Sequence, residues 1–336
     1  MRDMKSDHRK IMSLGKTSAV ISLPKKWLEA SGLEKGNLVN LEELANGALM
    51  VSPLKSDSEK LSEIQIKVEL NESSDSMVRR IVACSLDGYD RVTIVSRVFS
   101  PGHQQAIRAI SSMLYMMVEE SGAGKVVLKS IIDEYKTSIL SCIERMDAIT
   151  SSMCRDVIRA VPELDAELVR SVVEIEKDVD QLEFLVYRLI RLAIASPSTN
   201  DMTHLDYLDY QTLSHRIDRI ADQVETIARN IVEVFDTEKD FDSTYAVMKT
   251  VFDIYHQAMT CFLSRDISKV DMVFDGKKQV ESDIKELYSQ LASSSGLDGS
   301  VFISQMIIAN SLRNIAHYSS DIAELAIDQR YNPRPS

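Results

Sequence analysis

The chain repeats the stretch EKDVDQL (176–182) as ESDIKEL (281–287), and RIADQVETIA (219–228) as NIAHYSSDIA (314–323). The offsets are 105 and 95 residues, as expected for two three-helix units whose loops differ in length. Self-similarity at such a spacing is typical of an internal duplication. The sequence therefore predicts two structural units related by pseudo-symmetry.

The residues around these repeats follow the 3.6-residue period of amphipathic helices from about residue 132 onward. Breaks at proline, glycine and polar clusters leave six helices of about 25–35 residues joined by short loops, which is the pattern of antiparallel bundles. We predict a mainly α protein with one three-helix bundle over residues 132–236 and a second over residues 237–330.

A small β domain is predicted ahead of the helices, over residues 1–54. Short strand-like segments flank a helix that Pro24 begins, and Asn46-Gly47 is a strong hairpin signal. So short a unit cannot bury much of a core, so we expect it to dimerise. The polar segment 55–62 is predicted to be a linker.

A small α/β region is predicted between the linker and the bundles, over residues 63–131. Its pattern suggests strand, helix, strand, helix and strand, with the second helix spanning residues 101–122. It contains neither G-x-G-x-x-G nor a phosphate-binding P-loop. We expect a spacer or a dimerisation module.

The composition excludes several classes of protein. No stretch of 18 apolar residues is present, so no membrane span is expected, and the first ten residues lack the apolar segment of a secretory signal. The four cysteines are scattered without a C-x-x-C pair, which favours a reducing compartment. We expect a cytoplasmic protein.

Charge is distributed unevenly along the chain. The net charge is −12, yet residues 1–30 contain seven Lys and Arg against three acids and so carry +4. Such a basic segment can contact the phosphates of DNA, although ordinary surface charge is the alternative. The candidate DNA-binding residues are Arg9, Lys10, Lys16, Lys25 and Lys26.

Two acidic pairs form the candidate metal site. Glu176 and Asp180 share one helix face at i, i+4 spacing, as do Asp218 and Asp222 on the next helix. Adjacent helices can bring the pairs together into four carboxylates that a hard cation would neutralise. Solvated acidic faces are the alternative.

Catalytic patterns are missing from the sequence. No Ser/His/Asp or Cys/His arrangement is identifiable, and the paired Glu-x-x-His motifs of di-iron bundles are absent. We therefore expect no enzyme.

The segment GKTSAVISLPKKWLEASGLEKGNLVNLEE (15–43) resembles the SpoVT/AbrB swapped-hairpin family. The pattern that carries the resemblance is G-x-x-x-x-V-x-L-P-K, then a hydrophobic helix, then G-L-x-x-G-N/D-x-V. The resemblance implies an intertwined β homodimer that binds DNA, with the five basic residues named above as phosphate or base contacts.

Residues 132–330 resemble the PhoU phosphate-signalling family through EKDVDQL, RIDRIADQVETIA and LRNIAHYSSDIAELAI. The resemblance implies two three-helix bundles with metal-binding E/D-x-x-x-D motifs. The combination with the basic N-terminal segment resembles PhoU-like regulators known mainly from archaea.

The second repeat departs from this metal-binding pattern. Lys285, Arg313 and His317 replace Asp180, Asp218 and Asp222, and only Glu281 stays acidic. We therefore expect a divalent metal or iron ion in the first bundle only. Lys285 and Arg313 could pair with acids in a structural cluster, or with an anion such as phosphate.

These resemblances imply a DNA-binding transcriptional regulator of phosphate uptake whose helical body senses phosphate status through a metal, an anion or a partner. The alternative is an adaptor that does not bind DNA and docks on a phosphate transporter ATPase or a signalling kinase.

Overall fold

The computed structural model describes residues 9–14, 18–30, 32–43, 49–53, 62–133, 137–195, 202–235, 241–293 and 298–332. They fall into two compact units. The first, here called the head, contains the N-terminal residues as far as Lys60, and the second, here called the body, spans Leu61–Arg334.

The head consists of two separate antiparallel hairpins and a short helix. Strand β1 (Met12–Leu14) pairs with β2 (Ser18–Val20), and β3 (Val39–Glu43) pairs with β4 (Leu49–Pro53). Helix α1 (Lys25–Ala30) lies between them in sequence and follows Pro24, as predicted. The predicted Asn46-Gly47 turn lies outside the described residues, as do residues 54–61, which hold most of the predicted linker.

The body begins with a four-stranded sheet in the order β5-β6-β8-β7. Strand β5 (Glu63–Lys67) runs parallel to β6 (Arg91–Val95), and the other pairings are antiparallel. Helices α2 (Ser74–Leu86) and α3 (Pro101–Met113) connect the strands, and their apolar faces share one core with the sheet.

The predicted helix over residues 101–122 is wrong in its second half. Helix α3 ends at Met113, Tyr115 takes a positive φ of 50°, and Met116–Ser121 form strand β7, which pairs with β8 (Lys125–Ser130). A short apolar run fits both periods, and here pairing with the next strand of the chain decides between them. The region is therefore βαβαββ rather than βαβαβ.

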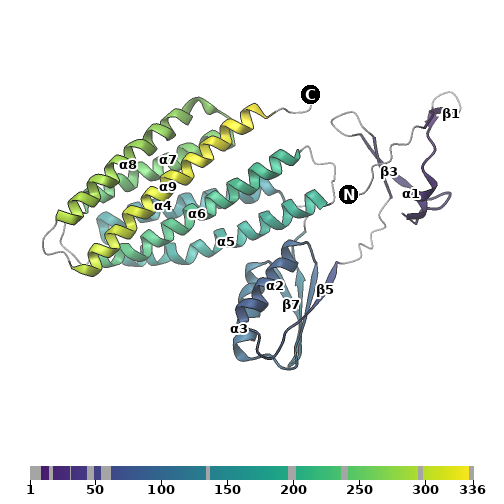
Figure 1. Cartoon of the computed structure of the whole chain (residues 1–336), viewed down its shortest axis with the longest axis horizontal. Helices are drawn as coiled ribbons and strands as arrows, with labels where there is room; N and C mark the ends of the chain where they lie inside the picture. The colour runs from purple at the N-terminus through teal and green to yellow at the C-terminus, as the bar shows by residue number, and fades with distance from the viewer. Residues whose placement is uncertain are drawn as a thin grey trace. The chain divides into compact units, whose positions relative to one another are not determined.

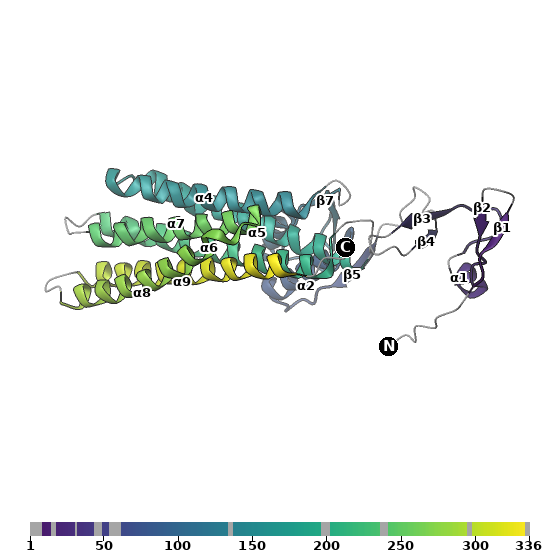
Figure 2. The same cartoon turned by 90° about the horizontal axis from the view of Figure 1, so that it is seen from above.

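Six long helices form the rest of the body (Figures 1 and 2), and their pattern confirms the predicted fold. The helices are α4 (Ile139–Glu163), α5 (Ala166–Ala195), α6 (His204–Phe235), α7 (Asp242–Ser264), α8 (Val270–Ser293) and α9 (Gly299–Tyr331). Helices α4–α6 pack against one another, and so do α7–α9.

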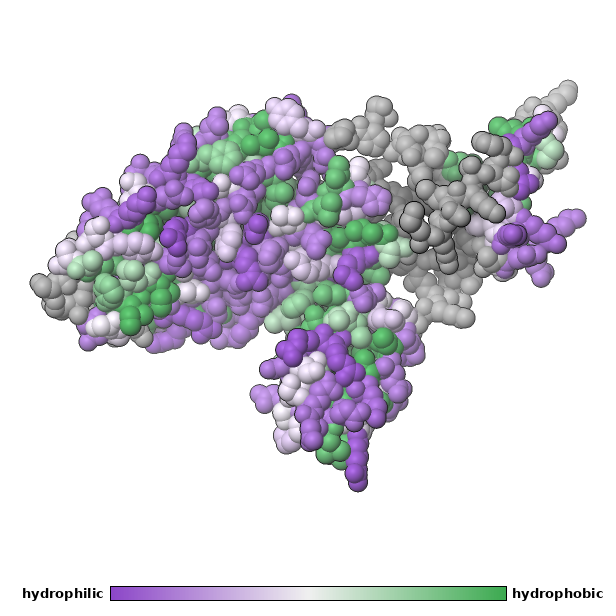
Figure 3. Space-filling model, viewed as in Figure 1, coloured by the Kyte–Doolittle hydropathy of each residue, from purple (hydrophilic) through white to green (hydrophobic). Residues whose placement is uncertain are grey.

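The two three-helix bundles share a continuous apolar core. They meet chiefly along α6 and α9, where Asn314 Nδ2 donates to Gln223 Oε1 at 3.1 Å and Arg216 Nε lies 2.9 Å from Asp321 Oδ2. The side of the bundles seen in Figure 3 is mostly hydrophilic, as expected for helices that each bury one face. Within the described residues, no helix is long and apolar enough to cross a membrane.

The α/β region is held against the bundles by α5. Arg188 of this helix is 2% exposed and donates to the carbonyl oxygens of Ser85 at 2.5 Å and Tyr89 at 3.1 Å. Its second amino group lies 3.3 Å from Asp90 Oδ1. Residues of α2 and of the turn that follows it are thus tied directly to the first bundle.

Candidate functional site

The structure brings the four predicted acids together on the facing sides of α5 and α6. Carboxylate oxygens of Glu176, Asp180 and Asp222 lie within 4.8 Å of one another. Asp180 also lies near enough to Asp218 for its carboxylate to raise the pKa of Asp218. Two helical turns of each helix thus supply one continuous acidic group.

Two further side chains extend this group, and the sequence prediction missed them. Glu183, His215 and Asp218 also place potential ligand atoms within 4.8 Å of one another. His215 Nδ1 lies 3.0 Å from Glu183 Oε1. A spacing signal was present, because Glu183 is three residues after Asp180 and His215 is three residues before Asp218, which places each on the face of the predicted ligands. We call these six residues the acidic centre.

Burial and mutual repulsion shape the electrostatics of the acidic centre. Burial raises the pKa of Glu176, and the carboxylates of Asp180, Glu225 and Asp222 raise it further. The pKa of Asp218 is likewise raised, first by burial and then by neighbouring carboxylates, chiefly Glu183. The carboxylates of the acidic centre are therefore only partly stabilised in their charged form by the surrounding protein.

Arg219 compensates only part of this charge. Its Nη1 lies 3.0 Å from Asp222 Oδ2, and its Nε lies 3.8 Å from Asp218 Oδ2. The arginine side chain is 45% exposed, so water screens its field. Asp218 Oδ1 is buried and accepts no hydrogen bond from any described residue. A buried carboxylate oxygen without a partner is unfavourable, and a cation would satisfy it.

The donor set of the acidic centre suits a particular class of ion. Five carboxylates and one imidazole favour hard or borderline cations such as Mg²⁺, Mn²⁺ or iron over soft ions, which prefer thiolates. The four cysteines are buried elsewhere in the body. In the described part of the second bundle, no comparable group of acids is found.

Four of the five predicted DNA-binding residues are described, and all four are exposed on the head. Arg9 and Lys10 precede β1, and Lys25 and Lys26 open α1 with exposed side chains. Lys25 forms only a long, exposed ion pair with Glu29, 3.8 Å apart. Lys16 lies outside the described residues. The head thus presents basic side chains at two separate places in its sequence.

Comparison with known families places both parts of the chain. Residues 143–231, which include the whole acidic centre, match the family model of the PhoU domain. This segment is therefore similar to a PhoU domain. Residues 14–59 match the family model of MazE, a bacterial antitoxin described as an antidote–toxin recognition domain.

Two solved PhoU structures are similar in fold to more than half of this chain. PhoU from Pseudomonas aeruginosa superimposes with a TM-score of 0.51 at 20% identity, over 56% of this chain and 94% of that one. The phosphate transport system regulatory protein PhoU from Streptococcus pneumoniae gives 0.53 at 12% identity, over 58% and 95%. No curated protein sequence matches the chain.

Proposed function

We propose that the chain is a regulator of phosphate uptake that binds DNA as a dimer through its head. The observation that carries the proposal is the union, in one chain, of a PhoU domain with a basic head that matches a MazE-type family. A structure of similar fold belongs to a regulator of a phosphate transport system. A regulator of transport that carries its own DNA-binding head can act on transcription directly.

The shape of the head supports dimerisation. Within the described residues each of its two sheets has two strands, and isolated two-stranded sheets are marginal in water. Large apolar side chains nevertheless stay exposed on it, and a second copy of the head would bury them. These side chains are Ile11, Met12, Ile21, Leu38, Leu41 and Leu49.

The acidic centre supports a metal-dependent signal in the body. Glu176, Asp180, Asp218 and Asp222 would hold a divalent metal or iron ion, with Glu183 and His215 completing the donor set. The ion would supply positive charge that offsets the repulsion between α5 and α6 and would satisfy Asp218 Oδ1. The two helices would then be tied more firmly when the ion is present.

A covalent and hydrogen-bonded route leads from this centre toward the head. The body begins at the end of the linker, where the Ser62 backbone N–H donates to Asp90 Oδ2 at 2.9 Å. Asp90 in turn pairs with Arg188, which lies on the same helix as Glu176. A change in the position of α5 would therefore reach the residues to which the linker is attached. Coupling between the acidic centre and the start of the body along this route requires that α5 adopt two different positions.

A salt titration of DNA binding tests the proposal. The probe is the DNA upstream of the chain's own gene and of neighbouring phosphate-transport genes, with random DNA as reference. We expect preferential binding that weakens steeply with salt, because each neutralised phosphate releases a counterion. Lys25→Ala/Lys26→Ala in both copies of a dimer should lower the slope by up to about four.

The chain offers a matched control for that variant. Lys277 and Lys278 form a second adjacent lysine pair, on α8 of the body, so Lys277→Ala/Lys278→Ala removes the same charge. This control should leave the slope unchanged. Absence of any preference over random DNA would contradict the DNA-binding role and favour an adaptor that docks on a transporter ATPase or a signalling kinase.

A further inference from the structure

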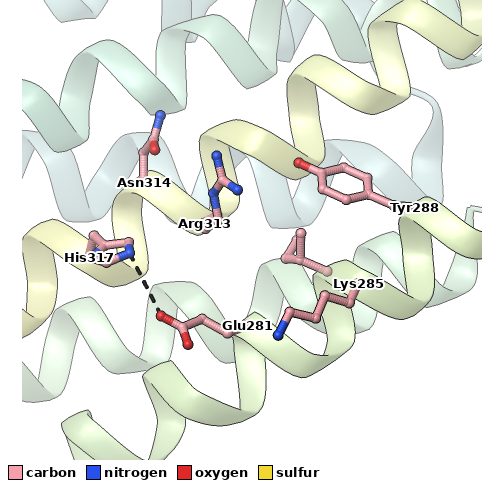
Figure 4. A pocket seen from close by; sticks show the side chains of 7 residues that line it. Glu281, Lys285, Tyr288, Arg313, Asn314 and His317 are labelled. Carbon is pink, nitrogen blue, oxygen red and sulfur yellow. Dashed lines mark ion pairs between the residues drawn. The ribbon is translucent and has the colours of Figure 1, made fainter.

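A pocket of about 330 Å³ opens between α8 and α9 of the second bundle. Figure 4 shows side chains of both helices around the same space, with Lys285 and Tyr288 on α8 and Arg313 and His317 on α9. Glu281, Ile284 and Asn314 complete its lining. At ~30 Å³ per water molecule, the pocket has room for roughly ten waters or a small hydrated ligand.

The pocket occupies the repeat position of the acidic centre. The offset of 105 residues relates α5 to α8, and the offset of 95 relates α6 to α9. Each residue of the acidic centre therefore has a counterpart on the second pair of helices. The counterparts are Glu281 for Glu176, Lys285 for Asp180, Tyr288 for Glu183, Asn310 for His215, Arg313 for Asp218 and His317 for Asp222.

Duplication has thus exchanged acceptors of hydrogen bonds for donors. Four of the five carboxylates are replaced by an ammonium, a phenol, a guanidinium and an imidazole, all of which can donate. Only Glu281 keeps its carboxylate. The same backbone frame that would attract a cation in the first bundle therefore presents positive charge and donors in the second.

The positive charge of the pocket is not neutralised by neighbouring acids. Glu281 lies 3.7 Å from His317, and Arg313 Nη2 donates to Asn310 Oδ1, a neutral partner, at 2.7 Å. Among the described residues, Lys285 has no ion pair. In a purely structural salt-bridge cluster, Lys285 and Arg313 would form ion pairs with acids, and neither does so with any described residue. Two permanent cations thus face a cavity with one carboxylate, which His317 already shares.

We propose that this pocket binds a tetrahedral oxyanion of the phosphate and sulfate class. The Arg313 guanidinium can donate two parallel hydrogen bonds to such an anion, which makes arginine a strong ligand for it. Lys285 supplies a second charge, and the Tyr288 hydroxyl supplies a neutral donor. The site is independent of metal in the first bundle and of DNA binding by the head.

Binding of inorganic phosphate to the full chain tests the site. The chain is first treated with a chelator, so that no anion can bind through a metal at the acidic centre, and binding is followed by calorimetry. Sulfate and glycerol phosphate are titrated in parallel, against a chloride background. We expect one saturable site per chain, weakened about tenfold or more in Arg313→Gln, because a charge-assisted hydrogen bond is lost.

Arg330→Gln is the matched control, because it removes the same charge from the same helix. The two arginines are 17 residues apart, which is about 25 Å along α9. Lys285→Gln is a second, independent variant, and thermal melting of each variant checks that it folds. Both pocket variants should weaken binding, and the control should bind as the unchanged chain does.

The possible outcomes separate the sources of the anion. Binding of inorganic phosphate or sulfate supports a free anion as ligand, and binding of glycerol phosphate alone supports a phosphate ester. The absence of saturable binding by all three probes would overturn the proposal. Equal binding by Arg313→Gln and Arg330→Gln, with Lys285→Gln also unchanged, would overturn it as well.

Discussion

At the scale of single residues, Asp218 has the least favourable electrostatic environment in the acidic centre. It is buried, it faces the carboxylates of Asp180 and Glu183, and its Oδ1 has no hydrogen-bond partner among the described residues. Burial and like charges both disfavour its ionised form. Such a residue lowers the free energy of unfolding of the metal-free chain. A bound cation would remove this destabilisation by neutralising the carboxylate.

We therefore predict that Asp218→Asn has opposite effects with and without metal. In the metal-free chain the substitution should raise the free energy of unfolding by roughly 1–2 kcal/mol, because it removes a buried charge that is poorly compensated. A cation at a hundred times its dissociation constant should stabilise the unchanged chain by about 2.7 kcal/mol. That gain corresponds to a rise in Tm of roughly 5–10 °C, which the variant should lose.

Asp178→Asn is the control for this prediction. Asp178 is exposed on the same helix as Asp180 but lies outside the acidic centre, so its substitution should change neither the metal-free Tm nor the rise with Mn²⁺, Mg²⁺ or Fe²⁺. Thermal melting with each ion and with a chelator supplies the measurement. A metal-induced rise in Tm that survives in Asp218→Asn would mean that the ion binds elsewhere.

At the scale of elements, two different faces of α5 make two different sets of contacts. One face holds Glu176, Asp180 and Glu183, and another anchors the α/β region through Arg188. Close packing supports the anchor, because a Cβ atom added at Gly88 would lie 2.4 Å from a methyl carbon of Leu192. Gly88 also has a φ of +88°, a conformation that side chains rarely adopt. The α/β region therefore packs against α5 around Arg188 and Leu192, and the same helix contributes half of the residues of the acidic centre.

Arg188→Met should loosen that attachment. The substitution keeps much of the apolar stem but leaves the carbonyl oxygens of Ser85 and Tyr89 without their buried donor, at a cost of about 2–3 kcal/mol. Hydrogen exchange should accelerate in residues 74–95 and stay unchanged in α7–α9. Arg191→Met, which removes an exposed ion pair with Asp87, is the control and should cost less than about 1 kcal/mol. Equal exchange in the two variants would show that Arg188 does not fasten the region.

The elements also show how far the sequence could predict this structure. Long amphipathic helices repeat their signal over many turns, so the six bundle helices and the approach of Glu176 to Asp222 across two of them followed from periodicity. Strand β7 could not be predicted in this way, because its six residues fit the period of a helix and that of a strand equally well. Pairing with β8 makes the segment a strand. Glu183 and His215 were missed for a related reason, since the i, i+4 acidic motif has no place for an i+3 acid or a histidine. Arg188 could not be recognised as an anchor, because its partners are backbone carbonyls about 100 residues away.

At the scale of the whole molecule, duplication gives one fold two chemically opposite sites. The acidic centre and the oxyanion pocket occupy equivalent positions on the two pairs of helices, and α6 and α9 pack against each other between them. Ligands at the two sites would thus act on helices that share one core. The described residues of the head, by contrast, belong to a separate compact unit.

The head should control the oligomeric state, because none of its described apolar side chains is buried. Leu41, on β3, is 59% exposed and lies opposite Val51 of β4, so an apolar pair occupies one face of the hairpin. We predict that Leu41→Lys converts a dimer to a monomer in sedimentation analysis and abolishes specific DNA binding, because the proposed DNA contacts require two paired heads. Leu208→Lys is the matched control, since Leu208 is 55% exposed on α6 of the body. If Leu41→Lys remained dimeric while Leu208→Lys dissociated, the body rather than the head would hold the dimer together, and the apolar face of the head would need another partner.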